Sequence, residues 1–166
     1  MRTLGFDPGN KGALALYDTA APKVIEAWAL PVIIEQRSKT KKTFIDEMGL
    51  CALLRSIGEV GEVWIEDVFS SSQMGVVSAF SFGEGKGIIK GCVAGVLKLA
   101  PHYVSPATWK AAMRVTADKN QTKRMARAIF RASPLSTEGK CEAALIALYG
   151  SLRRQANCLP HGTART

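Results

Sequence analysis

A short apolar segment near the N-terminus ends in an acidic residue and a glycine-rich turn, which limits the folds open to the chain. Residues 4–13 read Leu-Gly-Phe-Asp-Pro-Gly-Asn-Lys-Gly-Ala, and residues 2–7 are expected to form a buried strand with Asp7 at its end. An Asp at the mouth of a buried strand is typical of a metal ligand, whereas an Asp before Pro-Gly is also an ordinary turn residue. Taken alone, the segment leaves both interpretations open.

Two later segments place carboxylates in comparable positions. Residues 62–68 are expected to form a second buried strand that carries Glu66. Glu138 and Glu142 stand four residues apart at the start of a helix expected over residues 137–155, so both side chains project from one helical face. Such a pair is usually solvated, but Glu142 is followed directly by Ala-Ala-Leu-Ile-Ala and is expected near the buried side. Carboxylates from three separate elements are typical of a hard-cation site for phosphate chemistry.

Length and composition indicate one domain. With 166 residues, of which 47% are hydrophobic, the chain can bury a core without disulfides, and we expect a single domain over residues 1–155 and a flexible tail over 156–166. The four cysteines form no Cys-x-x-Cys pair, which argues against a zinc cage or a disulfide framework and favours a reducing cytoplasm. Lys90 and Lys98 interrupt the long apolar stretch 87–100, so no membrane association is expected.

The net charge indicates a polyanionic partner. Lys and Arg total 22 against 14 Asp and Glu, a formal charge of +8. Charge alone is weak support, because many basic proteins bind nothing specific. Residues 35–43 are expected to form a basic loop that either contacts a phosphate backbone or only keeps the chain in solution. The cations of this loop are Arg37, Lys39, Lys41 and Lys42.

The rest of the pattern is that of an α/β domain, with a glycine-containing long helix. Gly87, Gly91 and Gly95, called the glycine row below, repeat every four positions and let another backbone approach one helical face. The row is expected to pack either against the sheet of its own chain or against a dimer partner. The other expected elements are strands over residues 13–17, 24–30 and 102–104, and helices over 43–57, from 76 or 78 to 99, from 106 to 110, and after an N-cap at Asp118.

Several motifs in order make the chain resemble the RuvC-type Holliday junction resolvases of the ribonuclease H-like superfamily, and most closely their compact branch in phages, large DNA viruses and some bacteria. The resemblance covers nearly the whole chain. It implies an α/β, ribonuclease H-like fold with a five-stranded mixed sheet flanked by helices. The motifs are Gly5-Phe6-Asp7-Pro8-Gly9, Ile65-Glu66, the serine-rich turn from Ser71 to Gly75, Phe80-Ser81-Phe82-Gly83, Pro106-x-x-Trp109-Lys110 and the segment from Glu138 to Ala147.

The resemblance implies a metal-dependent endonuclease that works as a homodimer and resolves a four-way DNA junction by paired nicks. It implies two Mg²⁺ ions per site, for which Mn²⁺ can substitute. The family usually has Asp at the position of Glu138, so this ligand is one methylene longer here. Lys110 and Lys119 match positions where resolvases keep basic residues near the scissile phosphate. The catalytic metal ligands that it implies are Asp7, Glu66, Glu138 and Glu142.

Aromatic and basic residues complete the expected DNA contacts. Phe80 and Phe82, expected just before the long helix, could stack on an unpaired base, although at least one of them is expected in the core. Trp64 and Trp109 are assigned to packing, with Trp109 also orienting Lys110. The other expected DNA-binding side chains are Lys86, Lys123 and Arg127.

Three other functions compete with this interpretation. The Gly-x-Asp-x-Gly pattern also opens actin-like sugar kinases and ATPases, but those need a second phosphate loop and a longer chain. A nuclease of the same fold that acts on other branched DNA or on RNA–DNA hybrids stays open, because shape and backbone contacts dominate such recognition. A non-catalytic junction-binding module also stays open, although it would gain nothing from four carboxylates. The expected location is the cytoplasm of a bacterium or of a phage-infected cell.

Overall fold

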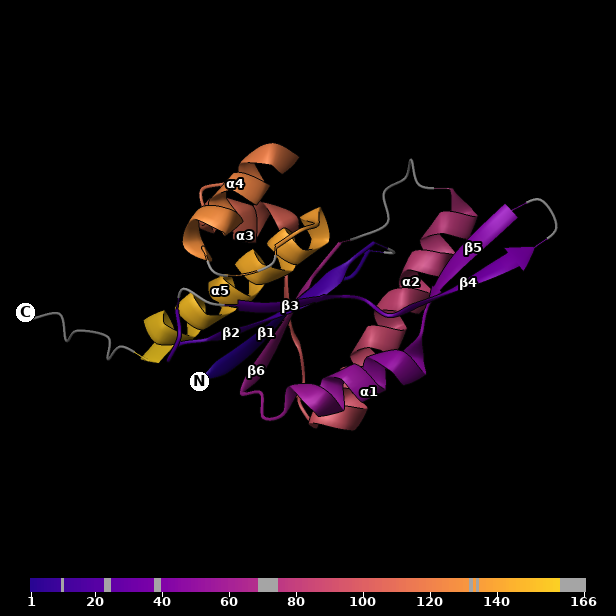
Figure 1. The fold of residues 1–166 in the computed structure, drawn as a ribbon, viewed down its shortest axis with the longest axis horizontal. Coiled ribbons are helices and arrows are strands. Elements are labelled where there is room, and N and C mark those ends of the chain that lie inside the picture. Colours follow the sequence, from indigo (N-terminus) through magenta and orange to yellow (C-terminus); the bar gives the residue numbers. More distant parts are fainter. Residues whose placement is uncertain are drawn as a thin grey trace, which may run out of the picture.

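The computed structural model describes residues 1–9, 11–22, 25–37, 40–68, 75–131, 133 and 135–158. A five-stranded sheet with the strand order β3-β2-β1-β6-β7 forms its centre (Figure 1). Neighbours among β1, β2 and β3 are antiparallel, whereas β6 and β7 run parallel to β1, so the expected five-stranded mixed sheet is confirmed. Its strands are β1 (Arg2–Asp7), β2 (Ala13–Asp18), β3 (Ile25–Ala29), β6 (Glu62–Glu66) and β7 (His102–Val104).

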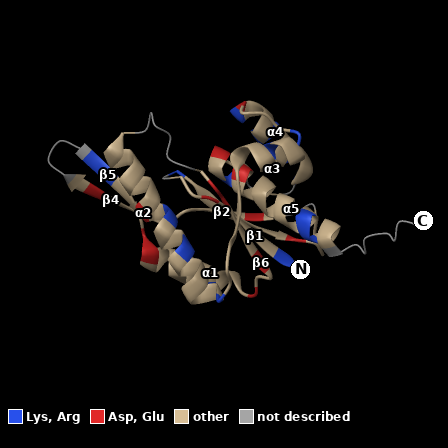
Figure 2. Cartoon of the chain, turned by 180° about the vertical axis from the view of Figure 1, so that it is seen from behind, with Lys and Arg blue, Asp and Glu red and all other residues tan. Residues whose placement is uncertain are grey.

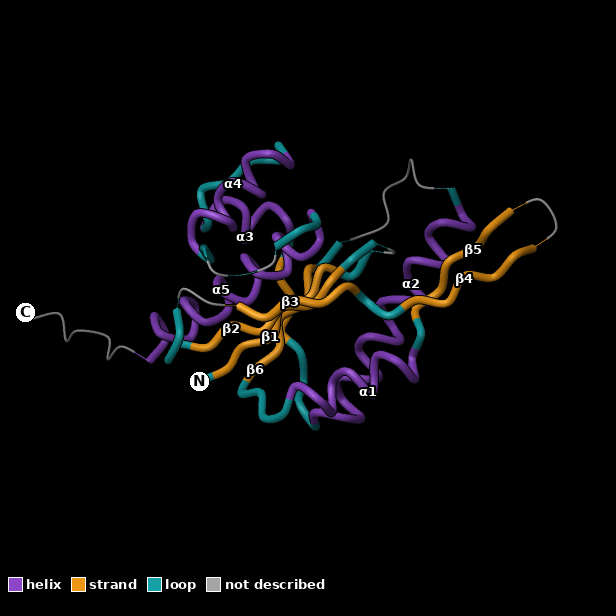
Figure 3. Tube along the Cα trace, viewed as in Figure 1, coloured by secondary structure: helices purple, strands orange, loops and turns teal. Residues whose placement is uncertain are grey.

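Helices cover both faces of this sheet (Figures 1 and 3). Because side chains alternate along a strand, each face carries its own apolar cluster. Leu4 and Phe6 of β1 pack with Leu50 of α1, while Ala13 and Ala15 of β2 pack with α5 on the opposite face. One face carries α1 (Glu47–Ile57), α2 (Val76–Cys92) and a short π-helix, η1 (Val93–Leu97); the other carries α3 (Pro106–Ala112), α4 (Lys119–Ile129) and α5 (Glu138–Cys158).

Helix α5 lies directly on β1 because a glycine leaves room for its backbone. Gly5 and Asp7 share the face of β1 that is opposite to Leu4. A Cβ atom at Gly5 would overlap the carbonyl oxygen of Ala143 and the amide nitrogen of Ala147. This close contact holds the first turns of α5 over the end of β1, where Asp7 stands.

We expect Gly5→Ala to lower the free energy of unfolding by about 1–3 kcal/mol, because the backbone of α5 cannot yield as a flexible side chain would. Gly83→Ala is the matched control, since Gly83 lies within α2 and an added Cβ meets no described atom within 4 Å. The control should raise stability by roughly 1 kcal/mol through helix propensity. Urea unfolding followed by circular dichroism measures both changes. Equal stabilities of the two variants would contradict the tight packing of α5 on β1.

Residues 35–37 and 40–43 lie on strands, so the expectation that they form a loop is wrong; residues 38 and 39 lie outside the described residues. Strands β4 (Val32–Arg37) and β5 (Thr40–Ile45) form an antiparallel hairpin that projects beside α2 (Figure 1). Apolar and β-branched residues on both strands favour extended structure. The charged side chains between them hide this pattern in the sequence. The helix expected from residue 43 therefore begins only at Glu47, after Asp46 as N-cap; Oδ1 of Asp46 accepts a hydrogen bond from the amide of Gly49 at 2.9 Å.

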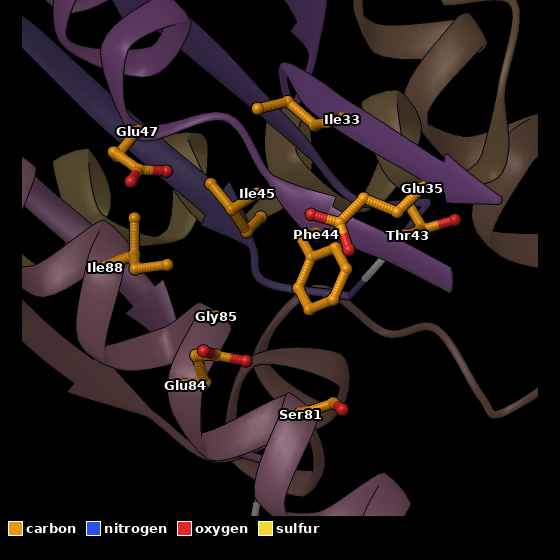
Figure 4. A pocket seen from close by; sticks show the side chains of 10 residues that line it. All are labelled: Ile33, Glu35, Thr43, Phe44, Ile45, Glu47, Ser81, Glu84, Gly85 and Ile88. Atoms are coloured by element: carbon orange, nitrogen blue, oxygen red, sulfur yellow. The ribbon is translucent and has the colours of Figure 1, made fainter. Parts of the chain in front are cut away.

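Between this hairpin and α2 lies a groove of about 240 Å³ (Figure 4). Phe44 reaches from β5 toward α2 and supplies the aromatic part of the lining (Figure 4). Glu35, Glu47 and Glu84 add three carboxylates to the same lining.

Helix α2 begins at Val76, as expected, but its helical backbone ends with η1 at Leu97 instead of at residue 99. Phe80 and Phe82 lie within α2, not before it. A Cβ atom added at any residue of the glycine row would meet no described atom within 4 Å. The expectation that the row packs against its own sheet is therefore wrong, and packing against a dimer partner stays a prediction.

Two helix starts agree with the sequence pattern. Pro106 is the first residue of α3, and Asp118 caps α4 through a hydrogen bond from the amide of Asn120 to Oδ1 at 2.9 Å. Helix α5 continues to Cys158, so the expected tail begins as helix. Residues 159–166 lie outside the described residues, as does the serine-rich turn before Gly75. None of the described helices is long and apolar enough to cross a bilayer.

Candidate active site

Four carboxylates converge at one end of the sheet. Asp7 is the last residue of β1 and Glu66 the last residue of β6, and the parallel pairing of these strands places their ends side by side. Glu138 and Glu142 lie in the first turns of α5. A Cβ atom at Gly139 would lie 3.0 Å from Oδ2 of Asp7, which shows how closely α5 approaches β1. We call Asp7, Glu66, Glu138 and Glu142 the carboxylate cluster.

Three members of the cluster line an open cavity of about 570 Å³. They are Asp7, Glu138 and Glu142, and the side chains of Lys11 and Lys119 line the same cavity. This volume falls within the range of ligand-binding pockets, about 300–1,000 Å³. Acidic and basic groups thus meet at an accessible surface, as binding of a charged ligand requires.

The surroundings of Asp7 disfavour its charged form. The pKa of Asp7 is raised from 3.8 to about 7, chiefly by burial and in addition by the negative charges of three neighbouring carboxylates, those of Glu142, Glu66 and Glu138. A hydrogen bond of 3.2 Å from the amide of Gly9 to Oδ1 opposes this rise. A cation placed among these groups would favour the deprotonated form of Asp7, because its positive charge offsets the burial and the neighbouring carboxylates.

Glu66 is buried, with 5% of its surface exposed, and has a defined partner. The indole Nε1 of Trp109 donates a hydrogen bond of 2.7 Å to Oε1 of Glu66. Burial raises the pKa of Glu66, and the charge of Glu142 adds to this rise; the hydrogen bond from Trp109 and the charge of Lys110 oppose it. The carboxylate of Glu66 is therefore oriented by α3, which lies above the sheet.

Two lysines pair with the two carboxylates of α5. Nζ of Lys110 lies 3.0 Å from Oε1 of Glu142, and both side chains are largely shielded, with 22% and 13% exposed. Nζ of Lys119 lies 3.1 Å from Oε1 of Glu138, but 72% of the Lys119 side chain is exposed. Charge interactions are stronger where water is excluded, so the Lys110 pair is the more firmly held.

The donor chemistry of the cluster fits a hard divalent cation. Carboxylate oxygens are the ligands that Mg²⁺ prefers, and a bound cation would offset the burial and the negative charges that raise the pKa of Asp7. As the side chains lie, no group of three or more His, Cys, Asp or Glu among the described residues is arranged to hold an ion. Because Glu138 and Glu142 face Lys119 and Lys110, they would have to turn to bind one.

Sequence reasoning missed the part played by Trp109. It assigned Trp109 to packing and to orienting Lys110, and the ring is indeed fully buried, with Nζ of Lys110 at 5.2 Å from its centroid. The contact with Glu66 joins residues 43 positions apart in the chain. The available signal was chemical, since a buried indole N–H needs an acceptor.

The expected DNA-binding residues of the hairpin lie on its strands. Arg37 ends β4, and Lys41 and Lys42 lie on β5. Nζ of Lys42 lies 4.6 Å from the ring centroid of Phe44, a cation–π contact on the hairpin itself. Lys39 lies outside the described residues.

The expected contacts of α2 differ in exposure. Phe80 has 71% of its surface exposed, whereas Phe82 is half-buried, so only Phe80 presents a free aromatic face. Lys86 forms an ion pair with Asp67, the residue after Glu66. Lys86, a residue of α2, is thus paired with the direct neighbour of one member of the carboxylate cluster.

The remaining expected contacts lie on α4, over the opposite face of the sheet (Figures 1 and 2). Lys123 is half-buried. Arg127 uses its Nε to donate a hydrogen bond of 3.1 Å to the carbonyl oxygen of Leu135. Lys119 is the first residue of α4, so this helix begins at the cluster and leads away from it.

Comparison of the sequence with models of known protein families, and with curated proteins, finds no match. Among solved structures, the chain is similar to RuvC of Thermus thermophilus in complex with a Holliday junction substrate, with a TM-score of 0.62 and 16% identity over 94% of this chain and 96% of that chain. A second Thermus thermophilus RuvC structure gives a TM-score of 0.60 and 17% identity over 95% of this chain and 97% of that chain. The chain therefore has the RuvC fold, a ribonuclease H-like fold, and the resemblance inferred from its motifs is confirmed at the level of the fold.

Proposed function

We propose that this protein is a metal-dependent DNA endonuclease that resolves four-way junctions by paired nicks. The observation that carries the proposal is the carboxylate cluster, gathered from β1, β6 and α5 at one end of a sheet with the RuvC fold. The similar RuvC structure that contains a Holliday junction substrate supports branched DNA as the substrate class. The formal net charge of +8 for the whole chain supports a polyanionic partner.

In this proposal the carboxylate cluster holds two Mg²⁺ ions, or Mn²⁺ in their place. When bound, such ions activate the attacking water and neutralise charge on the leaving 3′ oxygen of the phosphodiester. Asp7 is the ligand that the fold positions most rigidly, because it ends a central strand and lies under α5. Glu66 approaches from the neighbouring strand, and Glu138 and Glu142 approach from the helix.

The lysines of the site have a second task in this proposal. When Glu142 turns toward a cation, the ammonium group of Lys110 is released to stabilise negative charge on the scissile phosphate. Preorganised charges of this kind are most effective where water is excluded, which favours Lys110 over the exposed Lys119. Lys119 then assists mainly by attracting the DNA backbone.

Two surfaces extend the site toward DNA. The hairpin and α2 carry basic side chains, and the exposed ring of Phe80 can stack on an unpaired base at the branch point for roughly 1–3 kcal/mol. We further propose that the active form is a homodimer, since paired nicks in opposed strands call for two sites related by a twofold axis. The exposed glycine row on α2 and η1 supports a close helix contact between the two copies.

The test compares a labelled four-way junction, a linear duplex and an RNA–DNA hybrid, each with Mg²⁺ and with EDTA. We expect paired nicks at symmetric positions in the junction, no comparable cutting of the duplex or the hybrid, and complete loss of cutting in EDTA. Preferred cleavage of the hybrid would replace the proposal with a ribonuclease H activity. Tight junction binding without cleavage in any metal would replace it with a non-catalytic junction-binding module.

A further inference from the structure

A hydrogen bond between Trp109 and Glu66 joins helix α3 to the carboxylate cluster. Nε1 of Trp109 lies 2.7 Å from Oε1 of Glu66, and neither side chain has more than 5% of its surface exposed. We propose that Trp109 is a positioning residue, which orients Glu66 so that its second carboxylate oxygen faces a bound cation. This inference rests on the proposed function, because it assumes that Glu66 is a metal ligand.

The backbone around Trp109 is fixed relative to Glu66 by several hydrogen bonds. Strand β7 pairs with β6 so that Val104 is the partner of Glu66, and the amide of Asp67 donates a hydrogen bond of 2.7 Å to the carbonyl oxygen of Val104. Ser105 follows directly and caps α3, accepting a hydrogen bond from the amide of Thr108 at 3.2 Å. Trp109 is thus held five residues beyond the strand position that pairs with Glu66.

The next residue of α3 touches a second member of the cluster. Lys110 pairs with Glu142 of α5, while Trp109 contacts Glu66 of β6. Consecutive residues of one helix therefore engage carboxylates from two different elements. A displacement of α3 would disturb both contacts, so the position of α3 fixes the orientation of both carboxylates.

A comparison with a second buried tryptophan, Trp64, separates the positioning role of Trp109 from packing. Trp64 lies on β6 two residues before Glu66, and its Nε1 is buried with no hydrogen-bond partner in the described part of the chain. Both indoles fill space, but only that of Trp109 donates to a carboxylate. Partners that orient a metal ligand typically contribute 10- to 100-fold to metal affinity or activity.

The decisive variant is Trp109→Phe, which keeps an aromatic ring and removes the N–H donor. Trp64→Phe is the matched control, because it makes the same replacement where no hydrogen bond is lost. Mn²⁺ binding, measured by the electron paramagnetic resonance signal of free Mn²⁺, reports on the site without any cleavage reaction. We expect Trp109→Phe to weaken Mn²⁺ binding about 10- to 100-fold, and Trp64→Phe to leave it unchanged within about twofold.

A second measurement needs no variant to fold well. In the wild-type protein labelled with ¹⁵N-tryptophan, the indole N–H resonance of Trp109 should shift when Mg²⁺ is added. Unchanged Mn²⁺ affinity in Trp109→Phe, equal weakening in both variants, or an indole resonance that ignores Mg²⁺ would each overturn the inference while junction cleavage stands. A wild-type protein that binds no Mn²⁺ and cuts no junction would instead overturn the proposed function, and this inference with it.

Discussion

If the protein is the junction endonuclease proposed above, we expect Asp7→Asn to lower the single-turnover rate of junction cleavage by at least about 10³-fold and to leave junction binding intact. Asn has nearly the shape of Asp but lacks the charge that holds a cation. Metal stabilisation of a phosphoryl group amounts to several kcal/mol, and each 1.36 kcal/mol corresponds to a tenfold change in rate. Binding persists because the basic surfaces of the hairpin, α2 and α4 are untouched.

The position of Asp7 makes this the largest catalytic effect that we expect. It ends the central strand of the sheet and lies under the first turn of α5. Glu26→Gln is the control for removing one negative charge, because Glu26 is exposed on β3 opposite Leu16, away from the end of β2 that pairs with Asp7. Cleavage by Asp7→Asn within tenfold of the wild-type rate, measured with equal junction occupancy, would contradict a metal-binding Asp7.

In EDTA, the wild-type protein should lose stability as the pH rises from about 4 to about 7, and Asp7→Asn should remove most of that loss. Burial and the neighbouring carboxylates raise the pKa of Asp7 from 3.8 to about 7. Between these values the folded protein keeps a proton that the unfolded chain has released. Folding is then favoured by protons, so the free energy of unfolding falls through this window and levels off above it.

The size of the effect follows from the same shift. A change from 3.8 to about 7 corresponds to a few kcal/mol, with about 4 kcal/mol as its upper end. The raised pKa of Glu66 acts in the same direction, so a smaller slope should remain in the variant. Urea unfolding of both proteins at pH 4.5 and pH 8 measures the difference, and Asp7→Asn should be the more stable protein at pH 8.

Cation binding should reduce this difference at pH 8, because it stabilises the wild type more than the variant. Mg²⁺ at 100 times its dissociation constant stabilises a protein by about 2.7 kcal/mol if it binds only the folded state, and the gain should be confined to the wild type. A monovalent salt at the same ionic strength is the control for electrostatic screening. Two results would contradict this account of Asp7: equal or lower stability of Asp7→Asn than of the wild type in EDTA at pH 8, or an equal gain in stability of both proteins from Mg²⁺.

Local chemistry predicted the five-stranded sheet and the positions of four acids at the ends of its strands and at the start of the last helix. Asp7 and Glu66 each end an apolar strand, and Glu138 and Glu142 begin an apolar helix, so each could be recognised from a few neighbouring residues. The caps at Pro106 and Asp118 were visible for the same reason.

Local chemistry misled where strongly charged residues carried a strand. The composition of residues 35–43, with three lysines and one arginine, predicts a basic loop, whereas the structure has the strands β4 and β5. The hairpin depends on cross-strand pairing and on α2 beside it, neither of which a single segment reveals. The spacing of the glycine row likewise does not reveal whether the row faces its own sheet or a second copy of the chain.

The partners of the carboxylates were beyond the reach of sequence patterns. Trp109 donates to Glu66 from 43 positions away, and Lys110 pairs with Glu142 from another helix. Hydrophobic periodicity and capping residues depend on neighbours in the sequence, so the sequence alone predicts most strands and helices and the acids at their ends. Which side chains meet, and how far burial raises the pKa of Asp7, depends on the packing of α3 and α5 on the sheet, because charge and hydrogen-bond energies are set by distance and by the exclusion of water.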